Sequence, residues 1–467
     1  MSVKVKDMTS GKPMKLIFLF ALPLMVGNIF QQLYMVVDAI VVGQGVGVDA
    51  LAAVGATDWT HWVLLWMILG LTQGFAVMIS QFFGAGDIEN LRKTVTMSIV
   101  LCLGFGVFFT VLGLIIARPT LQLLRTPDDI IDQALIYLSI LFGGMLIVTV
   151  YNIFSSILRA LGDGRTPLIA MILAGCINIV LDLLFVLVFH WGIAGAAIAT
   201  LLAQAFSAVY CILSVRRISV LSFEKKYWKL DWDIIKHLCS LGIPIGLQMA
   251  IIGVGGMVLQ FVLNQFGTTV IAGFTATNKL YGLLESSAIS FGFAMNTFVG
   301  QNLGARKFDR IHEGVRSVIK LSILLCLAIG GIMILFGKPL LSMFVSSSAQ
   351  NKEQVLDIAY QYLFIMSCTL IFLYLLHAYR AALQGLGNGK KPMISGLMET
   401  LMRVGVSLIL PRIIGEIGIF FCEPAAWFGA AVYLIFAYYS EIRKIVRKLE
   451  TEQADSALQN EQLEEAK

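Results

Sequence analysis

The segment CINIVLDLLFV, residues 176–186, places two polar side chains inside a long apolar run. Asn178 and Asp182 are the only strongly polar residues between Leu168 and Phe189. They are four residues apart, so on a helix they lie on one face. A carboxylate in such a run costs free energy to keep, and an ionisable residue at membrane depth indicates a functional site.

A second group of polar and aromatic residues stands near the start of another apolar run. Asp58 lies one or two helical turns into this run, and we interpret it first as a solvated vestibule residue and second as a cavity acid. His61 and three tryptophans beside it are typical of the aromatic belt at a membrane surface, which we favour over a site that stacks substrates. The tryptophans are Trp59, Trp62 and Trp66.

The second half of the chain also carries charges inside apolar runs. Glu399 and Arg403 are four residues apart, which predicts an internal salt bridge on one helix face. Lys279 and Glu285 are six residues apart, so they need not pair with each other within a helix. If one of them faces a cleft, its charge would attract a charged substrate. Candidate residues for a substrate cavity are therefore Asp58, His61, Lys279, Glu285 and Glu399.

The composition places all these residues in a membrane protein. The 467 residues are 58% hydrophobic and 13% charged, and the mean hydropathy is +0.83. A soluble domain has about 25% charged residues. The seven cysteines form no CxxC pair and the five histidines form no HExxH motif, so we expect neither disulfides nor a metal-dependent enzyme and no cofactor.

Twelve apolar runs are long enough to cross a bilayer as helices, which requires about 20 residues each. The predicted fold class is thus an all-α polytopic membrane protein. The runs lie near residues 14–40, 52–80, 95–117, 131–157, 167–189, 193–214, 238–264, 270–300, 317–337, 356–385, 393–414 and 424–441.

Lysine and arginine are divided unequally between alternate connections of these helices. One side of the membrane receives 25 of them and the other receives 5. The basic side faces the cytoplasm by the positive-inside rule, which predicts that both termini are cytoplasmic in a multi-pass cell (plasma or inner) membrane protein.

The same pattern divides the chain into five segments. We predict a cytoplasmic N-terminus, an N-terminal six-helix lobe, a basic cytoplasmic linker, a C-terminal six-helix lobe and a cytoplasmic polar tail, solvated or disordered from Glu450. Their ranges are 1–13, 14–214, 215–237, 238–441 and 442–467.

Short motifs recur in order along the two lobes. QFFGAGD at 81–87 returns as QNLGARK at 301–307, and LAAVGAT at 51–57 returns with the same offset as IAGFTAT at 271–277. LGDGRTP at 161–167 returns as LGNGKKP at 386–392. Because six helices is an even number, both lobes have the same orientation and are related by an axis along the membrane normal. Two such lobes around a central cleft are typical of a secondary transporter.

The chain resembles the multidrug and toxic compound extrusion (MATE) family over about residues 14–445. The resemblance is carried by ALPLMVGNIFQQLYMVVDAIVVG, QFFGAGD, RALGDGRTP and GIAGAAIAT. It implies two pseudo-symmetric six-helix bundles of MATE/MOP type around a V-shaped central cavity. It also implies export of amphipathic, often cationic drugs or toxins in exchange for inward H⁺ or Na⁺.

The resemblance further implies a cation-coupling site in the N-terminal lobe. Its residues would be Asp38, Asn178, Asp182 and Thr200, and Pro23 would be a hinge of the first helix, although a static kink is an equal alternative. One family branch places its essential acids on helices seven and ten, but 240–264 and 359–385 contain no acid here. Coupling through those two helices is therefore not expected.

The chemistry of these four residues suits either ion. Two carboxylates brought together in a dry lobe resist simultaneous ionisation, so at least one can hold a proton and the pair titrates as a unit. Alternatively, Asp38 and Asp182 both ionise around Na⁺, to which Asn178 and Thr200 add neutral oxygens. H⁺ and Na⁺ remain open, as does a purely structural role of Asn178 and Thr200 in joining helices.

Two other functions were weighed against drug antiport. A flippase of a lipid-linked precursor would need several basic residues for a pyrophosphate, and the predicted spans of the N-terminal lobe contain none. A membrane-embedded enzyme would need a catalytic motif, and none is found. The expected partners are small amphipathic or cationic molecules and membrane lipid, without nucleic acid or an obligate protein partner, so we expect a monomer.

Overall fold

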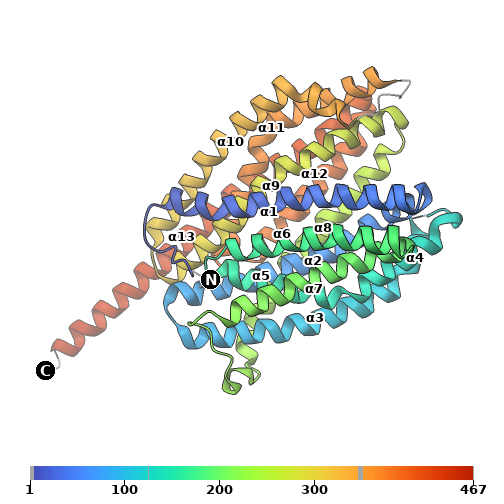
Figure 1. The fold of residues 1–467 in the computed structure, drawn as a ribbon. Helices are drawn as coiled ribbons and strands as arrows, with labels where there is room; N and C mark the ends of the chain where they lie inside the picture. Colours follow the sequence, from blue (N-terminus) through green and yellow to red (C-terminus); the bar gives the residue numbers. More distant parts are fainter. Residues whose placement is uncertain (1–4, 125, 345–350, 466–467) are drawn as a thin grey trace.

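The computed structural model describes all residues except 1–4, 125, 345–350 and 466–467. This described part is helical and contains no β-strand. Long helices run side by side along one axis, and both termini lie at the same end (Figure 1). The predicted all-α class is confirmed.

The N-terminal lobe consists of six spans. The fourth is bent by 45° at Gly144, where α4 meets α5. The sixth predicted span, 193–214, lies within α7. The helices are α1 (Pro13–Gly45), α2 (Val48–Ala85), α3 (Ile88–Leu123), α4 (Asp128–Gly143), α5 (Met145–Ala160), α6 (Arg165–Asp182) with the π-helical η1 (Leu183–Val188), and α7 (Gly192–Arg216).

The C-terminal lobe repeats this plan. α9 and α10 begin at the positions equivalent to the starts of α2 and α3, as the offset of the repeated motifs predicts. The elements are α8 (Trp232–Leu263), α9 (Thr268–Gly304), α10 (Phe308–Ser342), α11 (Lys352–Gly385), α12 (Lys390–Ile414), the 3-10 turn η3 (Gly415–Phe421) and α13 (Cys422–Glu465).

Helices that are long and apolar enough can cross a membrane. In the described chain nine stretches qualify, or ten if α4 and α5 count as one span. One of the nine, Lys390–Arg447, contains two spans, α12 and part of α13. α9 is not among the nine because it carries polar residues such as Asn278, Lys279 and Glu285 where it lines a cavity. Together with α9 these helices account for the twelve predicted spans.

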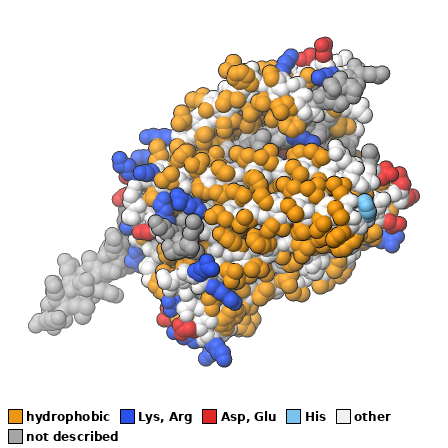
Figure 2. Space-filling view, in the orientation of Figure 1, with side chains coloured by type: hydrophobic (Ala, Val, Ile, Leu, Met, Phe, Trp, Pro, Cys, Tyr) orange, Lys and Arg blue, Asp and Glu red, His pale blue; other side chains and the backbone are white. Residues whose placement is uncertain are grey.

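The outer surface of the bundle is apolar. Figure 2 shows hydrophobic side chains covering the middle of the molecule, with Lys and Arg gathered at the end that holds the termini. Side chains such as Ile115, Leu324 and Leu335 are more than half exposed on this surface. Such a band cannot face water at this extent, so it is the surface that lipid covers.

The first helix is shared between the two lobes. Ile17, Phe20 and Leu24 of α1 belong to the buried core of the C-terminal lobe, whereas Val41 and Val42 belong to that of the N-terminal lobe. Pro23 lies at the end of the first group, within a continuous helix. The predicted N-terminal lobe therefore does not pack as a separate unit, because half of its first helix belongs to the other core.

The linker and the tail lie outside the two lobes. Within the linker 215–237, only the 3-10 turn η2 (Lys225–Trp228) precedes α8, and Arg92 holds the linker through a 2.9 Å hydrogen bond from its Nε to the Val220 carbonyl. The tail was expected to be solvated or disordered from Glu450. α13 continues as a helix to Glu465 and projects away from the bundle (Figure 1), so this part of the tail is helical and lies outside the packed lobes.

A core substitution tests the packing of the N-terminal lobe. Phe142 of α4 is fully buried against Gly113 of α3. We expect Phe142→Ala to lower the free energy of unfolding by about 3 kcal/mol or more, because it leaves a cavity in a close-packed core. Thermal unfolding in detergent would measure the effect. The control Phe108→Ala removes a side chain that is 54% exposed on the lipid surface, and equal shifts in both variants would contradict this packing.

Candidate functional site

A central cavity lies between the two lobes. Its N-lobe compartment has a volume of about 590 Å³ and its C-lobe compartment about 670 Å³. Both compartments are lined by Trp59, Trp62, Glu285 and Phe293, so they form one continuous space bordered by α2 and α9. The volume is that of a site for a drug-sized molecule.

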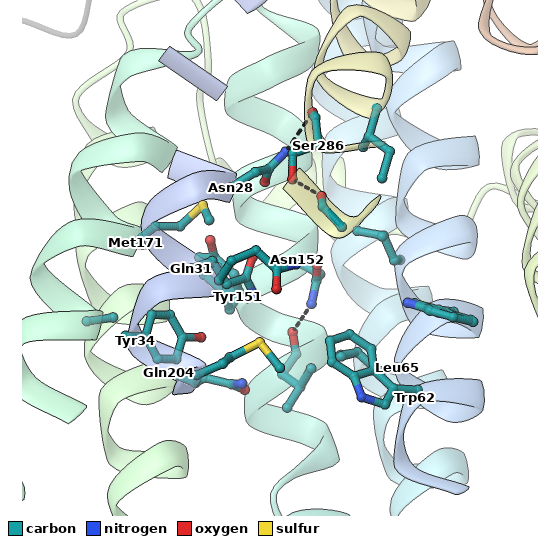
Figure 3. A pocket seen from close by; sticks show the side chains of 18 of the residues that line it. Asn28, Gln31, Tyr34, Trp62, Leu65, Tyr151, Asn152, Met171, Gln204 and Ser286 are labelled. Carbon is teal, nitrogen blue, oxygen red and sulfur yellow. Dashed lines mark hydrogen bonds between the residues drawn. The ribbon is translucent and has the colours of Figure 1, made fainter. Parts of the chain in front are cut away.

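Tryptophans form one wall of this cavity. Trp59, Trp62 and Trp66 lie on one face of α2 and line it, and the rings of Trp62 and Trp66 are 5.7 Å apart. Figure 3 shows Trp62 and Leu65 on the side of the pocket opposite Tyr34 and Gln204. The prediction of an outer aromatic belt is wrong for these residues, because α2 turns this face toward the cavity and α8.

The predicted coupling acids come together behind the other wall. Asp182, the last residue of α6, is fully buried, and Asp38 of α1 is partly buried. Their carboxyl groups lie close enough to share a hydrogen bond when one of them holds a proton. The sequence prediction that acids from distant spans converge therefore agrees with the geometry.

Asn178 and Thr200 complete this cluster. The Asn178 amide nitrogen lies 3.5 Å from the Thr200 hydroxyl oxygen, and that hydroxyl donates to the Ala196 carbonyl at 3.1 Å. Among the described residues no donor reaches four buried oxygens of the cluster, which are Asp38 Oδ1, Asn178 Oδ1 and both carboxyl oxygens of Asp182. A buried acceptor without a donor is costly. A proton or a small hard cation would satisfy these oxygens, so the residues present fit either ion.

The cluster lies one helical turn from the cavity on each of its three helices. Tyr34, Ala174 and Gln204 line the cavity, and each is four residues from a member of the cluster, Asp38, Asn178 and Thr200 respectively. α1 and α6 run away from the basic end, and α7 runs toward it. In all three helices the cluster residue therefore lies farther from the basic end than the cavity residue does. One turn is about 5.4 Å, so ion and substrate would occupy adjacent but separate places.

The backbone after Asp182 leaves the regular helix. The six residues Leu183–Val188 form a π-helix, which the sequence pattern did not predict. Single π turns are frequent at functional sites because they change the direction of side chains within a helix. Here the change begins at the residue next to the buried acid, and it adds Phe185 to the stacked rings of Phe189 and Trp191.

α1 packs closely on α6 at two glycines. A methyl group at Gly175 would lie 2.6 Å from the ring of Phe30, and one at Gly27 would lie 3.2 Å from Leu168. α1 is also tied to α9, since the Asn28 amide donates to the Ser290 hydroxyl at 3.1 Å and to the Ser286 carbonyl at 3.5 Å. Figure 3 shows Asn28 beside Ser286. Movement of α1 would therefore change the contacts of both lobes.

The C-lobe half of the cavity holds a network of paired charges. Glu399 accepts from Arg380 at 2.6 Å and from Arg403 at 3.1 Å, and Arg403 also donates to Glu423 at 2.8 Å. The predicted salt bridge between Glu399 and Arg403 is confirmed. Arg380 and Glu423 were not singled out in the sequence, although each is an ionisable residue within or beside an apolar run.

The other predicted cavity residues divide into two groups. Asp58, Lys279 and Glu285 line the cavity, Glu285 with its carboxylate 3.9 Å from the imidazole of His377. His61 is not among the described lining residues and packs instead against Trp62 and Phe142. The structure therefore places His61 behind the tryptophan wall and not in the predicted cavity role.

One basic residue in the N-lobe was missed. Arg159, counted in the sequence as a residue of the basic surface, lines the cavity with its guanidinium 4.6 Å from the ring centre of Phe293. It donates to Ser155 and Ser156 one turn earlier on α5. The statement that the N-lobe spans lack a basic residue is corrected, because α5 extends to Ala160.

These features together define a class. Two repeated six-span lobes around a central cavity form the fold that this chain shares with solved structures of MOP-superfamily transporters. The MatE family model matches residues 23–184 and 244–409, and the chain belongs to this family.

Individual relatives agree with this assignment. The chain is 34% identical to "Probable multidrug resistance protein YpnP" of Bacillus subtilis (strain 168), over 78% of this chain and 82% of that protein. It is 26% identical to "Probable multidrug resistance protein NorM" of Thermotoga maritima, over 89% and 88%. A solved structure described as an outward-facing multidrug resistance MATE family transporter superimposes with a TM-score of 0.88 at 24% identity, covering 96% of this chain and all of that chain.

The charge network of the C-lobe can be tested by removing its central acid. Among the described residues, Glu399→Gln leaves Arg403 with one carboxylate partner, Glu423, and Arg380 with none. Breaking a buried ion pair on one side costs about 3–5 kcal/mol, so we expect a clear drop in the temperature of unfolding in detergent. The matched control Glu89→Gln removes an acid whose side chain is 70% exposed and pairs only with Lys93, and it should change little. A stable Glu399→Gln protein would contradict the network.

Proposed function

We propose that this transporter exports amphipathic, often cationic compounds across the cell membrane in exchange for inward H⁺ or Na⁺. Both termini and the basic end would face the cytoplasm, and the protein would act as a monomer. The observation that carries the proposal is the cluster of buried oxygens at Asp38, Asn178 and Asp182, which no described donor satisfies. The family and the names of its relatives support the substrate class.

Ion binding would act on α1. A proton shared by Asp38 and Asp182, or a Na⁺ bound between them, leaves one net negative charge in place of two. It therefore reduces the repulsion between helices α1 and α6 and lets them pack more closely. Pro23 lacks a backbone N–H, which weakens the helix at one point. This point lies where α1 passes from one lobe's core to the other's, so a bend there would move the α1 wall of the cavity and displace substrate outward.

The cavity suits an aromatic cation. Trp62 and Trp66 offer ring faces, which attract cations, and Asp58 and Glu285 add negative charge on the same space. The exchange is driven by the ion gradient and the membrane potential, and each charge that crosses contributes about 2.3 kcal/mol per 100 mV.

The alternative of a lipid-linked precursor flippase is less well supported. Such a ligand needs basic side chains that are free to bind a pyrophosphate. Arg380 and Arg403 lie in the cavity, but their charges are matched by Glu399 and Glu423. Arg159 and Lys279 remain, and they come from opposite lobes.

Transport in liposomes tests the proposal. Purified protein would be reconstituted with an imposed H⁺ or Na⁺ gradient, and the movement of a fluorescent cationic dye would be followed. We expect Asp38→Asn and Asp182→Asn to abolish gradient-driven movement, because neither amide can release a proton or supply a carboxylate to Na⁺, while dye still binds.

The matched control is Asp132→Asn, an exposed acid on α4 of the same lobe. It should transport dye as the unchanged protein does. Full transport by either Asp38→Asn or Asp182→Asn would refute the site, and the gradient that drives the unchanged protein would identify the coupling ion.

A further inference from the structure

Two glutamines reach from one lobe to the other at the basic end of the cavity. Gln81 at the end of α2 donates from Nε2 to the Gly385 carbonyl of α11 at 2.9 Å. Gln301 at the end of α9 donates from Nε2 to the Ala160 carbonyl of α5, also at 2.9 Å. Each glutamine thus caps the last turn of a helix in the opposite lobe.

These two bonds are related by the internal repeat. Gln81 and Gln301 begin the recurring motifs QFFGAGD and QNLGARK. Ala160 and Gly385 each stand directly before the recurring motifs LGDGRTP and LGNGKKP. The two donors thus occupy equivalent positions in the two repeats, and so do the two acceptors. The two hydrogen bonds together form a two-fold symmetric contact between the lobes.

Two glycines bring the backbones of the same helices together. A methyl group added at Gly84 would lie 1.9 Å from the carbonyl oxygen of Gln301, and one added at Gly304 would lie 1.9 Å from that of Gln81. Gly84 and Gly304 are again equivalent positions, the fourth residue of each repeated motif. Only glycine permits this approach of α2 and α9, so the contact leaves no space between the lobes at this level.

The segment before α1 covers one side of this contact. Met8 is fully buried, its N–H donates to Gln301 Oε1 at 2.8 Å, and its carbonyl accepts from Asn302 at 3.2 Å. The Lys6 N–H donates to the carbonyl of Leu161, in the N-terminal lobe, at 3.1 Å. This short segment thus connects α9 to the end of α5, and Gln301 contacts both the segment and α5.

We propose that Gln81 and Gln301, with Gly84 and Gly304, form the gate that closes the central cavity on the basic side, and that residues 5–10 latch one half of it. The inference rests on the proposed exchange, in which the cavity would open by alternating access to one side of the membrane and then to the other. Opening toward the basic side would require the lobes to separate here. Opening breaks both glutamine bonds and pulls the segment at Met8 from its place.

The gate can be measured as a distance between the lobes. Glu89 and Asp309 are exposed, repeat-equivalent positions just beyond the two glycines. Spin labels on Glu89→Cys and Asp309→Cys, in the full chain with its native cysteines replaced, would report closed and open gates as short and long distances. Gln81→Ala and Gln301→Ala should each raise the ratio of open to closed protein about five-fold, the equivalent of one net hydrogen bond.

Glycine substitutions give a stronger and independent test. Gly84→Ala and Gly304→Ala cannot form the closed contact without moving a helix, so both should show mainly the long distance. The controls are Gly104→Ala and Gly331→Ala, where an added methyl group meets nothing within 4 Å. Thermal unfolding of each variant would show that it has folded, and the glutamine variants, which only remove atoms, remain informative if a glycine variant fails to fold.

The latch predicts an asymmetry between the two glutamines. In a protein shortened by residues 1–8, Gln301→Ala should add less to the opening than it does in the full chain, whereas the effect of Gln81→Ala should be unchanged. Equal effects in both backgrounds would refute the latch. Unchanged distances in the glutamine and glycine variants would refute the gate.

These outcomes are separate from the proposed function. If the gate variants open but Asp38→Asn and Asp182→Asn transport dye fully, the gate stands and the ion site fails. If the acid variants abolish transport while the gate variants keep the short distance, the ion site stands and the gate fails.

Discussion

The structure depends on how the charges of carboxylates at membrane depth are balanced in each lobe. In the C-terminal lobe, Glu399 is held between Arg380 and Arg403, so its charge is permanently balanced. In the N-terminal lobe, Asp38 and Asp182 face each other with no described donor for three of their oxygens. A buried charge without a partner is unstable. In the proposed mechanism a mobile ion would balance the N-terminal pair, whereas two arginines balance Glu399 in the C-terminal lobe.

The two lobes that differ in this way are built from an internal repeat. Equivalent helices α2 and α9 form the two sides of the cavity and touch each other at its basic end. Where the repeats agree, as in their glutamines and glycines, the residues join the lobes. Where the repeats differ, as at Trp59 and its counterpart Lys279, the residues line the cavity and give its two halves different chemistry. α1 departs furthest from symmetry, since it packs in both cores.

Sequence reasoning was most successful where a rule of the bilayer applies. Apolar length predicted twelve spans, and the cost of a buried acid pointed to Asp182. It failed where the environment of a residue depends on the direction in which its side chain points. The tryptophans of α2 were assigned to a lipid belt because hydropathy does not tell a lipid face from a cavity face. Arg159 was assigned to the surface because it lies near a helix end, and the π turn after Asp182 has no signal in the apolar pattern.

The buried position of Met8 has a consequence for how the molecule is made. Met8 leaves the ribosome before its partner Gln301, which follows 293 residues later. Its bonds to Gln301 and Asn302 therefore cannot form until α8 and α9, the first two helices of the second lobe, are in the bilayer. Docking of Met8 on Gln301 would therefore follow the insertion of these two helices.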